Sequence, residues 1–238
     1  MRLLAGTSGF SYKEWLGAFY PDDLSAKGML AHYATRLPIV EINNTFYRMP
    51  NTAAIQGWRS QVPDSFRFAI KMPRRISHSK RLKDCGAELS ALGTALADLG
   101  PTLGSLLVQL PPHARCDETA LVAFLSELPE GWRVAFEFRN DSWHVPTVFK
   151  KLESRNAALV QSESDETFEL KPWTADWAYL RLRRVDYSLE DLERWLERIR
   201  ASRVAEAHVF FKHEDGATGP KLAAELLAMA RGRRAVAP

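Results

Sequence analysis

Eight short apolar segments, separated by longer stretches of mostly helical periodicity, constrain the fold of this sequence more than any other feature. These segments predict strands at residues 2–6, 39–43, 66–72, 105–110, 133–138, 157–161, 178–182 and 207–212. Amphipathic periodicity predicts helices at residues 24–36, 52–61, 87–99, 118–128, 146–154, 189–201 and 221–231. Because strand and helix alternate, we expect right-handed crossovers and a parallel sheet, and eight repeats close a barrel. We therefore predict an α/β fold, a single (β/α)8 TIM-type barrel.

The connection after the sixth predicted strand is the irregular part of this pattern. Residues 162–176 are polar and include Pro172, which leaves little room for a full helix, so we expect one degenerate crossover there. The rival architecture is an open doubly wound sheet, which usually begins with a GxGxxG turn that residues 6–9 (GTSG) do not provide. The barrel is favoured, with residues 1–231 as its single domain and residues 232–238 as a basic C-terminal tail.

The composition is that of an ordinary globular protein. Hydrophobic residues make up 46% of the chain and charged residues 26%, which argues against a disordered or membrane-spanning chain. No apolar run approaches the ~18 residues of a membrane span, and the first residues lack a secretory signal, so we expect a cytoplasmic protein with no membrane partner. Cys85 and Cys116 have no CxxC spacing and are expected as free thiols. The formal net charge of +3 says little about partners or oligomeric state.

Polar and charged side chains stand at the carboxyl ends of strands that should otherwise be apolar on both faces. They are Glu41, Asn43, Lys71, Gln109, Glu137, Arg139, Arg181, Lys212 and His213. Side chains of a strand alternate between its two faces, so Glu41 shares a face with Asn43, and Glu137 with Arg139. Because barrel enzymes build their active sites at this end, we expect these groups to converge in one pocket.

Two interpretations of this polar layer are open. In the structural one, Glu41 and Glu137 only form ion pairs that close the top of the barrel. We favour the functional one, a ligand pocket, because clusters of perturbed titratable groups often mark functional sites. In that pocket we predict Glu41, Glu137 and Lys71 as catalytic groups. The predicted substrate-binding residues are Asn43, Tyr47, His78, Gln109, Arg139, Trp143, Arg181, Lys212 and His213.

A basic loop and nearby aromatic residues indicate the kind of ligand. Residues 71–83 hold six lysines or arginines, and residues 181–184 add three arginines. Such clusters suit a phosphate, sulfate or carboxylate group, or the backbone of a nucleic acid. Aromatic rings such as Tyr47 and Trp143 can stack on bases, although most rings at strand ends only cover a barrel rim.

Metal, glycosidase and serine-nucleophile chemistry have weaker support. The histidines are scattered without an HExxH motif, so we expect no cofactor, and the one conceivable metal set is His78, Glu137 and His213. Glu41 and Glu137 come from nearly opposite strands, which disfavours the spacing of about 5.5 Å used by retaining glycosidases. Ser8 lies outside any GxSxG elbow.

Six segments in the first two thirds of the chain match a known family. They are residues 6–9 (GTSG), 15–21 (WLGAFYP), 40–47 (VEINNTFY), 68–73 (FAIKMP) with Ile76 and His78, 107–112 (LVQLPP), and 136–139 (FEFR) with Trp143. Through them the sequence resembles the YecE-like family, known as domain of unknown function 72. The resemblance implies a TIM barrel but no established activity. The last third departs from the family pattern, with RLRR at residues 181–184 and FKH at residues 211–213.

Together these observations predict an enzyme, a hydrolase or a lyase or isomerase, that acts on a small anionic substrate by acid–base chemistry. A phosphorylated sugar or a nucleotide would fit the charge of the pocket. The alternative is a nucleic-acid-binding protein or nuclease relative that uses the basic loop and the rim aromatics. A third interpretation is a non-catalytic sensor of a small ligand.

Overall fold

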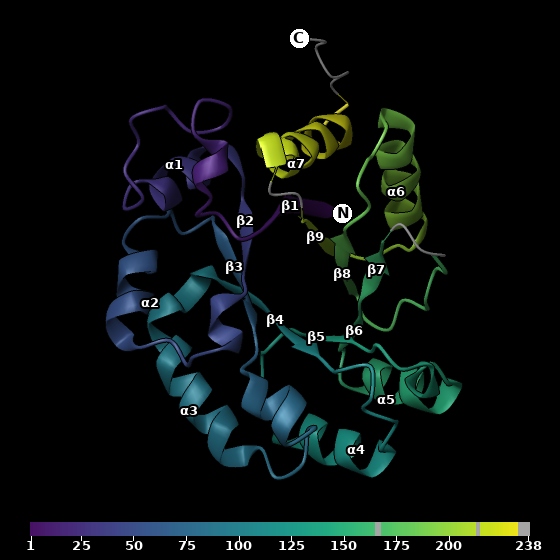
Figure 1. Cartoon of the computed structure of the whole chain (residues 1–238). Helices are drawn as coiled ribbons and strands as arrows, with labels where there is room; N and C mark the ends of the chain where they lie inside the picture. Colours follow the sequence, from purple (N-terminus) through teal and green to yellow (C-terminus); the bar gives the residue numbers. More distant parts are fainter. Residues whose placement is uncertain (165–167, 213–214, 233–238) are drawn as a thin grey trace.

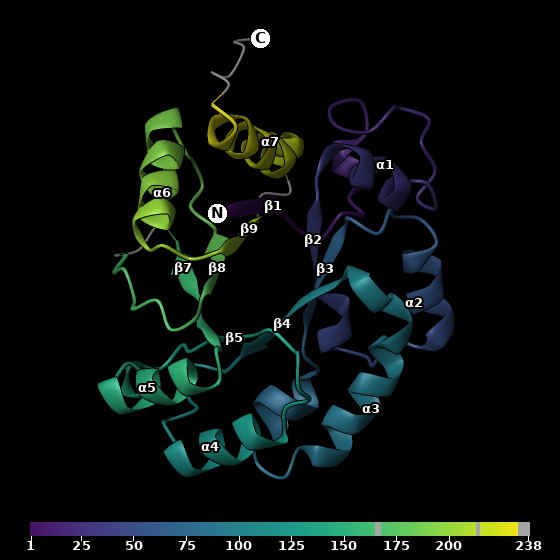
Figure 2. The same ribbon diagram turned by 180° about the vertical axis from the view of Figure 1, so that it is seen from behind.

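One parallel sheet of nine strands forms the centre of the molecule. The computed structural model describes residues 1–164, 168–212 and 215–232. The strands are β1 (Arg2–Ser8), β2 (Ile39–Ile42), β3 (Arg67–Lys71), β4 (Leu103–Gln109), β5 (Val134–Glu137), β6 (Ala158–Leu159), β7 (Gln161–Glu163), β8 (Trp177–Leu182) and β9 (Glu206–Phe211). Their order in the sheet is β6-β5-β4-β3-β2-β1-β9-β8-β7. The strands surround a common axis with the helices outside them (Figures 1 and 2), a nearly closed TIM-like barrel of the predicted α/β class.

The sixth predicted strand is split into two pieces. β6 pairs with β5, whereas β7 pairs with β8, and only Val160 separates the two pieces. The backbone N–H of Val160 still donates to the carbonyl of Phe136 in β5, at 2.9 Å. The chain therefore stops pairing with β5 and starts pairing with β8 within a few residues. At this point the covalent chain, rather than a continuous ladder of strand hydrogen bonds, completes the barrel.

Seven α-helices are present in the described part of the chain, at positions close to those predicted. They are α1 (Met29–Arg36), α2 (Thr52–Arg59), α3 (Gly86–Leu96), α4 (Glu118–Glu127), α5 (Pro146–Ser154), α6 (Leu189–Ala201) and α7 (Thr218–Ala230). Residues 24–28, predicted as helix, lie outside α1, and residues 26–28 form a turn in which Gly28 N–H donates to Ser25 O at 2.9 Å. A capping box between Ser188 and Asp191 fixes the start of α6. None of these described helices is long and apolar enough to cross a membrane.

The expected degenerate crossover lies between β7 and β8. Its described residues, 164 and 168–176, contain no helix. Side chains hold the returning chain instead. Gln161 exchanges two hydrogen bonds of 2.9 Å with the backbone of Lys171, and Thr174 accepts from Leu159 N–H at 2.8 Å and donates to Ala157 O at 2.7 Å. These contacts replace the packing that a helix would supply.

The interior of the barrel is filled by apolar side chains from every strand except β7. Its apolar cluster consists of Leu4, Ile39, Ala69, Leu107, Ala135, Ala158, Val160, Trp177, Tyr179 and Phe210. Because side chains alternate along a strand, the residue two positions later points to the same interior. That later residue is Glu41 on β2, Lys71 on β3, Gln109 on β4 and Glu137 on β5. The apolar core is thus capped, at the carboxyl ends of the strands, by a polar layer.

Candidate active site

A hollow of about 230 Å³ lies above this polar layer. The residues that line it are Ser8, Tyr12, Asn43, Tyr47, Lys71, Gln109, Arg139, Arg181, Arg183 and Lys212. Seven of them belong to the predicted site: Asn43, Tyr47, Lys71, Gln109, Arg139, Arg181 and Lys212. The structure therefore brings most of the predicted residues together at one opening to solvent.

Arg181 is the centre of the polar layer. Its guanidinium donates to Glu41 through Nη2 at 2.9 Å and to Glu137 through Nη1 at 2.7 Å. Arg181 and Glu137 are each 4% exposed, and Glu41 is fully buried. Charges buried to this extent persist only when they are paired, so these three groups depend on one another.

The two carboxylates accept hydrogen bonds from protein donors at all four oxygens. Glu41 accepts from the Ser8 hydroxyl, from Asn43 Nδ2 at 3.0 Å and from the Tyr179 hydroxyl at 2.6 Å. Burial raises the pKa of Glu41, but Arg181 and these donors outweigh burial and hold the pKa below its ordinary value.

Glu137 is held in the same way. It accepts from Gln109 Nε2 at 2.8 Å, from Arg139 Nε at 3.3 Å and from Arg183 Nη2 at 3.1 Å. Burial raises the pKa of Glu137, yet Arg181, Arg183 and Arg139 together lower it far below the ordinary range. Both glutamates are therefore ionised and fully engaged by the protein.

Lys71 differs from the other cations of the hollow. Its ammonium donates to Gln109 Oε1 at 2.8 Å and lies 4.3 Å from the centre of the Phe46 ring, and it forms no ion pair with a carboxylate in the described part of the chain. Burial and the nearby Arg181 lower its pKa to about 8. The lowered pKa brings proton exchange at Lys71 closer to neutral pH.

Two donors of the hollow have no acceptor. The Nε–H groups of Arg181 and Arg183 are buried, and neither finds a partner among the described residues. A buried unpaired donor costs about 1–3 kcal/mol, and more on a charged group. Both residues line the hollow, so an anion bound there would lie beside the two side chains that carry these donors.

Some predicted residues lie apart from this hollow or at its edge. Tyr47 is 83% exposed at the rim. His78, in the short helix η3 (Arg75–Ser79), contacts the Phe46 ring edge-on, and burial and then Lys71 lower its pKa. Trp143 is buried: its indole N–H donates to Ala114 O at 2.8 Å, and its ring stacks on Phe138 with the centroids 4.6 Å apart. Neither His78 nor Trp143 lines the hollow, and His213 lies outside the described residues.

Four contributors were absent from the predicted site: Ser8, Tyr12, Tyr179 and Arg183. Ser8 and Tyr179 bond to Glu41, and Arg183 bonds to Glu137. The alternation of side chains could have found Arg183, which follows Arg181 by two residues. Tyr12 comes from the loop after β1, and its place depends on a hydrogen bond to Ser8 O, 2.7 Å long, that no sequence pattern indicates.

Three of the six cations in the basic loop at residues 71–83 form ion pairs. Arg75 and Lys80 both bond to Glu88, at 2.6 and 2.7 Å, and Lys83 bonds to Asp117 at 2.8 Å. These pairs reduce the positive charge that the loop presents to solvent.

Within the described residues, no three His, Cys, Asp or Glu side chains are grouped so that they could hold a metal ion.

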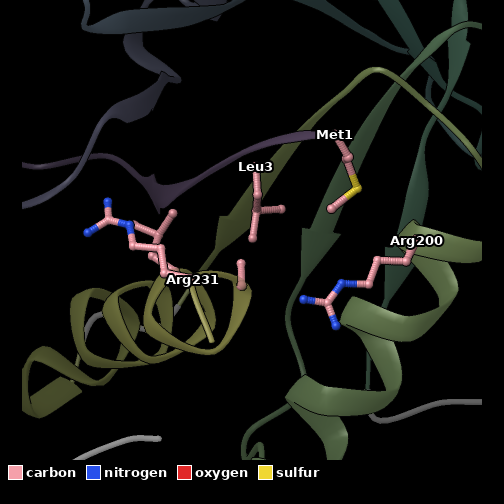
Figure 3. Close-up of a pocket in the computed structure, with 6 residues that line it drawn as sticks. Met1, Leu3, Arg200 and Arg231 are labelled. Atoms are coloured by element: carbon pink, nitrogen blue, oxygen red, sulfur yellow. The ribbon is translucent and has the colours of Figure 1, made fainter. Parts of the chain in front are cut away.

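The opposite end of the barrel carries a different hollow and a buried polar chain. The hollow, of about 390 Å³, is lined mainly by apolar residues, with Arg200 of α6 and Arg231, which follows α7, on either side of Leu3 in Figure 3. Nearby, His208 joins Ser105 at 3.0 Å and Glu206 at 2.9 Å. Ser105, His208 and Glu206 are all buried and line none of the hollows described here, so a substrate has no access to the serine.

Comparison with known proteins agrees with the fold. A family model described as "Protein of unknown function DUF72" matches residues 4–238. The UPF0759 protein YunF of Bacillus subtilis (strain 168) is 24% identical over 142 residues, 56% of this chain and 50% of YunF, so the match spans about half of that relative. The crystal structure of the DUF72 family protein TM1631 from Thermotoga maritima MSB8 has a TM-score of 0.83 and 25% identity, covering 97% of this chain and 100% of that one. The DUF72 family protein EF0366 from Enterococcus faecalis V583 has a TM-score of 0.76 and 19% identity, covering 97% and 98%.

Proposed function

We propose that this chain, which belongs to the DUF72 family, is an enzyme that binds a small anionic substrate in the hollow at the carboxyl ends of its strands. The observation that carries the proposal is the pair of buried Nε–H donors on Arg181 and Arg183. A phosphate, sulfate or carboxylate oxygen would accept from such donors with a charge-assisted hydrogen bond.

The charge of the hollow supports the same ligand class. Five cationic side chains line it: Lys71, Arg139, Arg181, Arg183 and Lys212. Among the residues that the structure describes, only two carboxylates, Glu41 and Glu137, contact this set, and both lie beneath the hollow rather than in its lining. The excess of positive charge attracts anions, and the partly buried setting weakens screening by salt.

Within this proposal, the glutamates and Lys71 have different tasks. Glu41 and Glu137 hold the arginines in place, because their lowered pKa values and occupied oxygens make them poor proton donors and acceptors. Lys71 is the acid–base group, since its pKa of about 8 permits proton transfer at neutral pH. The reaction classes compatible with one such acid–base group are hydrolysis and a lyase or isomerase step.

Titration calorimetry with inorganic phosphate tests the proposal. We expect binding to the purified protein, and a loss of about tenfold in affinity for Lys212→Ala, which removes one cation from the edge of the hollow. The matched control is Lys150→Ala, which removes an exposed lysine from α5, on the outside of the barrel. Equal affinity of the two variants, or no binding of phosphate or of any small carboxylate, would refute the site.

A screen of phosphorylated and carboxylated metabolites tests the enzymatic part. Any turnover found should fall at least 100-fold in Lys71→Met, because one acid–base group contributes about 10²–10⁴-fold.

Nucleic-acid binding is the alternative. Binding through the backbone weakens steeply as salt rises, so oligonucleotides that bind equally at 50 and 200 mM salt, or not at all, would reject that alternative.

A further inference from the structure

A second hollow, of about 240 Å³, adjoins the cationic one. It is lined by Gly9, Phe10, Ser11, Tyr12, Ile42, Asn43, Asn44 and Trp58. Tyr12 and Asn43 line both hollows, so they form the boundary between them. Small-molecule sites usually enclose roughly 300–1,000 Å³, a size that neither hollow reaches alone and that the two reach together. This comparison favours one site with two compartments.

The two compartments differ in chemistry. The cationic hollow is lined by five lysines and arginines, whereas none of the described residues that line the second hollow is charged. Three aromatic residues, Phe10, Tyr12 and Trp58, line the second hollow together with Ile42. Aromatic walls of this kind suit a flat ring, which can stack on or pack against them.

Tyr12 and Asn43, at the boundary, are held by hydrogen bonds to residues in or beneath the cationic hollow. Tyr12 donates its hydroxyl to Ser8 O at 2.7 Å, and Asn43 donates to Glu41 at 3.0 Å. Gly9 lies at φ +96°, and a Cβ on it would come within 2.5 Å of the Tyr12 hydroxyl. A residue other than glycine would therefore displace Tyr12 and change the passage between the compartments.

We infer that the substrate is of the nucleoside monophosphate class, with its phosphate in the cationic hollow and its base in the hollow of Phe10, Tyr12 and Trp58. The inference rests on the proposed function, which supplies the phosphate position. It adds a second hollow that binds the base, which recognition of the phosphate alone would not require. Asn43 and Asn44 stand at the wall of the second hollow, where their amides can bond to the edge of a base.

Calorimetry with ligands of increasing size separates the two compartments. The probes are inorganic phosphate, ribose 5-phosphate and the monophosphates AMP, GMP, CMP and UMP. We expect at least one nucleotide to bind about 10- to 100-fold more tightly than ribose 5-phosphate, because stacking of one base on an aromatic residue contributes that much. Trp58→Leu should remove this selectivity and leave the Kd for ribose 5-phosphate within about twofold, whereas Trp58→Phe, which keeps a ring, should retain most of it.

Trp58 also packs on Phe68, so a folding defect could lower the affinity of a Trp58 variant. A second measurement, on the unaltered protein, avoids this problem. In the unaltered protein, the favoured nucleotide should quench tryptophan fluorescence, and ribose 5-phosphate should not. In Trp58→Phe that quenching should be lost. If nucleotides bind no more tightly than ribose 5-phosphate while phosphate still binds, this inference is wrong and the proposed function stands. If phosphate, every nucleotide and every small carboxylate fail to bind, the proposed function fails as well. Preference for single-stranded oligonucleotides over every monophosphate would also overturn the inference.

Discussion

Arg181 and Glu41 lie 140 residues apart in the sequence and meet at 2.9 Å in the interior of the barrel. The same guanidinium holds Glu137 at 2.7 Å, so one side chain joins strands β2, β5 and β8. Because Nη1 and Nη2 are bonded to different glutamates and the side chain is buried, the arginine keeps a fixed orientation. A fixed cation can present its remaining donor to a ligand without further ordering.

Removal of Arg181 should destabilise the protein strongly. Arg181→Met leaves Glu41 and Glu137 buried without their shared partner, and loss of one member of a buried ion pair costs about 3–5 kcal/mol. Urea unfolding should show this decrease in the free energy of unfolding. Arg139→Met is the control: its side chain is 39% exposed, so its loss should cost less than about 1 kcal/mol. Equal decreases in the two variants would contradict the central position of Arg181.

The charge state of Lys71 should control anion affinity. The folded pKa of about 8 means that the ammonium loses its proton as the pH rises through 8. Sulfate keeps a constant charge in this range, so its affinity should fall by about fivefold between pH 7 and pH 9 as one nearby positive charge is lost. The Lys71→Met variant should bind more weakly and show no such step. A pH profile that is unchanged in the variant would assign the step to another group.

Acid should destabilise the opposite end of the barrel. The bond to His208, and then the arginines Arg133 and Arg2, lower the pKa of Glu206 to about 2 against the opposing effect of burial. A carboxylate with a lowered folded pKa contributes stability that is present above its unfolded pKa, near 4.5, and is lost as the pH falls to about 2. The free energy of unfolding should therefore lose about 2 kcal/mol over that window through this group, and Glu206→Gln should reduce the loss. Parallel pH profiles of the two proteins would show that Glu206 is not responsible.

Much of the fold was predictable because it depends on local patterns. All eight predicted strand positions correspond to strands of the barrel, since each is a short apolar run. The break at Val160 was not predictable, because it depends on which neighbour each half of the strand pairs with. The alternation of side chains also placed Glu41, Gln109, Glu137 and Arg181 in one layer. It gave no information on loop residues, so the burial of Trp143 and the position of Tyr12 had to come from the structure.

Trp143 illustrates this difference between strand and loop residues, and its role can be tested directly. Its indole bond to Ala114 and its stacking on Phe138 indicate a structural task. Trp143→Phe should lower the free energy of unfolding by about 1–2 kcal/mol through the lost hydrogen bond and packing, and leave the Kd for phosphate within about twofold. A large loss of phosphate affinity without loss of stability would restore Trp143 to the binding site predicted from the sequence.

The most direct test of the anion site is a crystal structure with bound selenate, a tetrahedral dianion whose selenium can be located by anomalous scattering. We predict a selenium peak in the hollow between Lys71, Arg183 and Lys212, with selenate oxygens within about 3 Å of the Nε atoms of Arg181 and Arg183. Selenate bound only elsewhere on the protein, with this hollow free of anomalous density, would contradict the account.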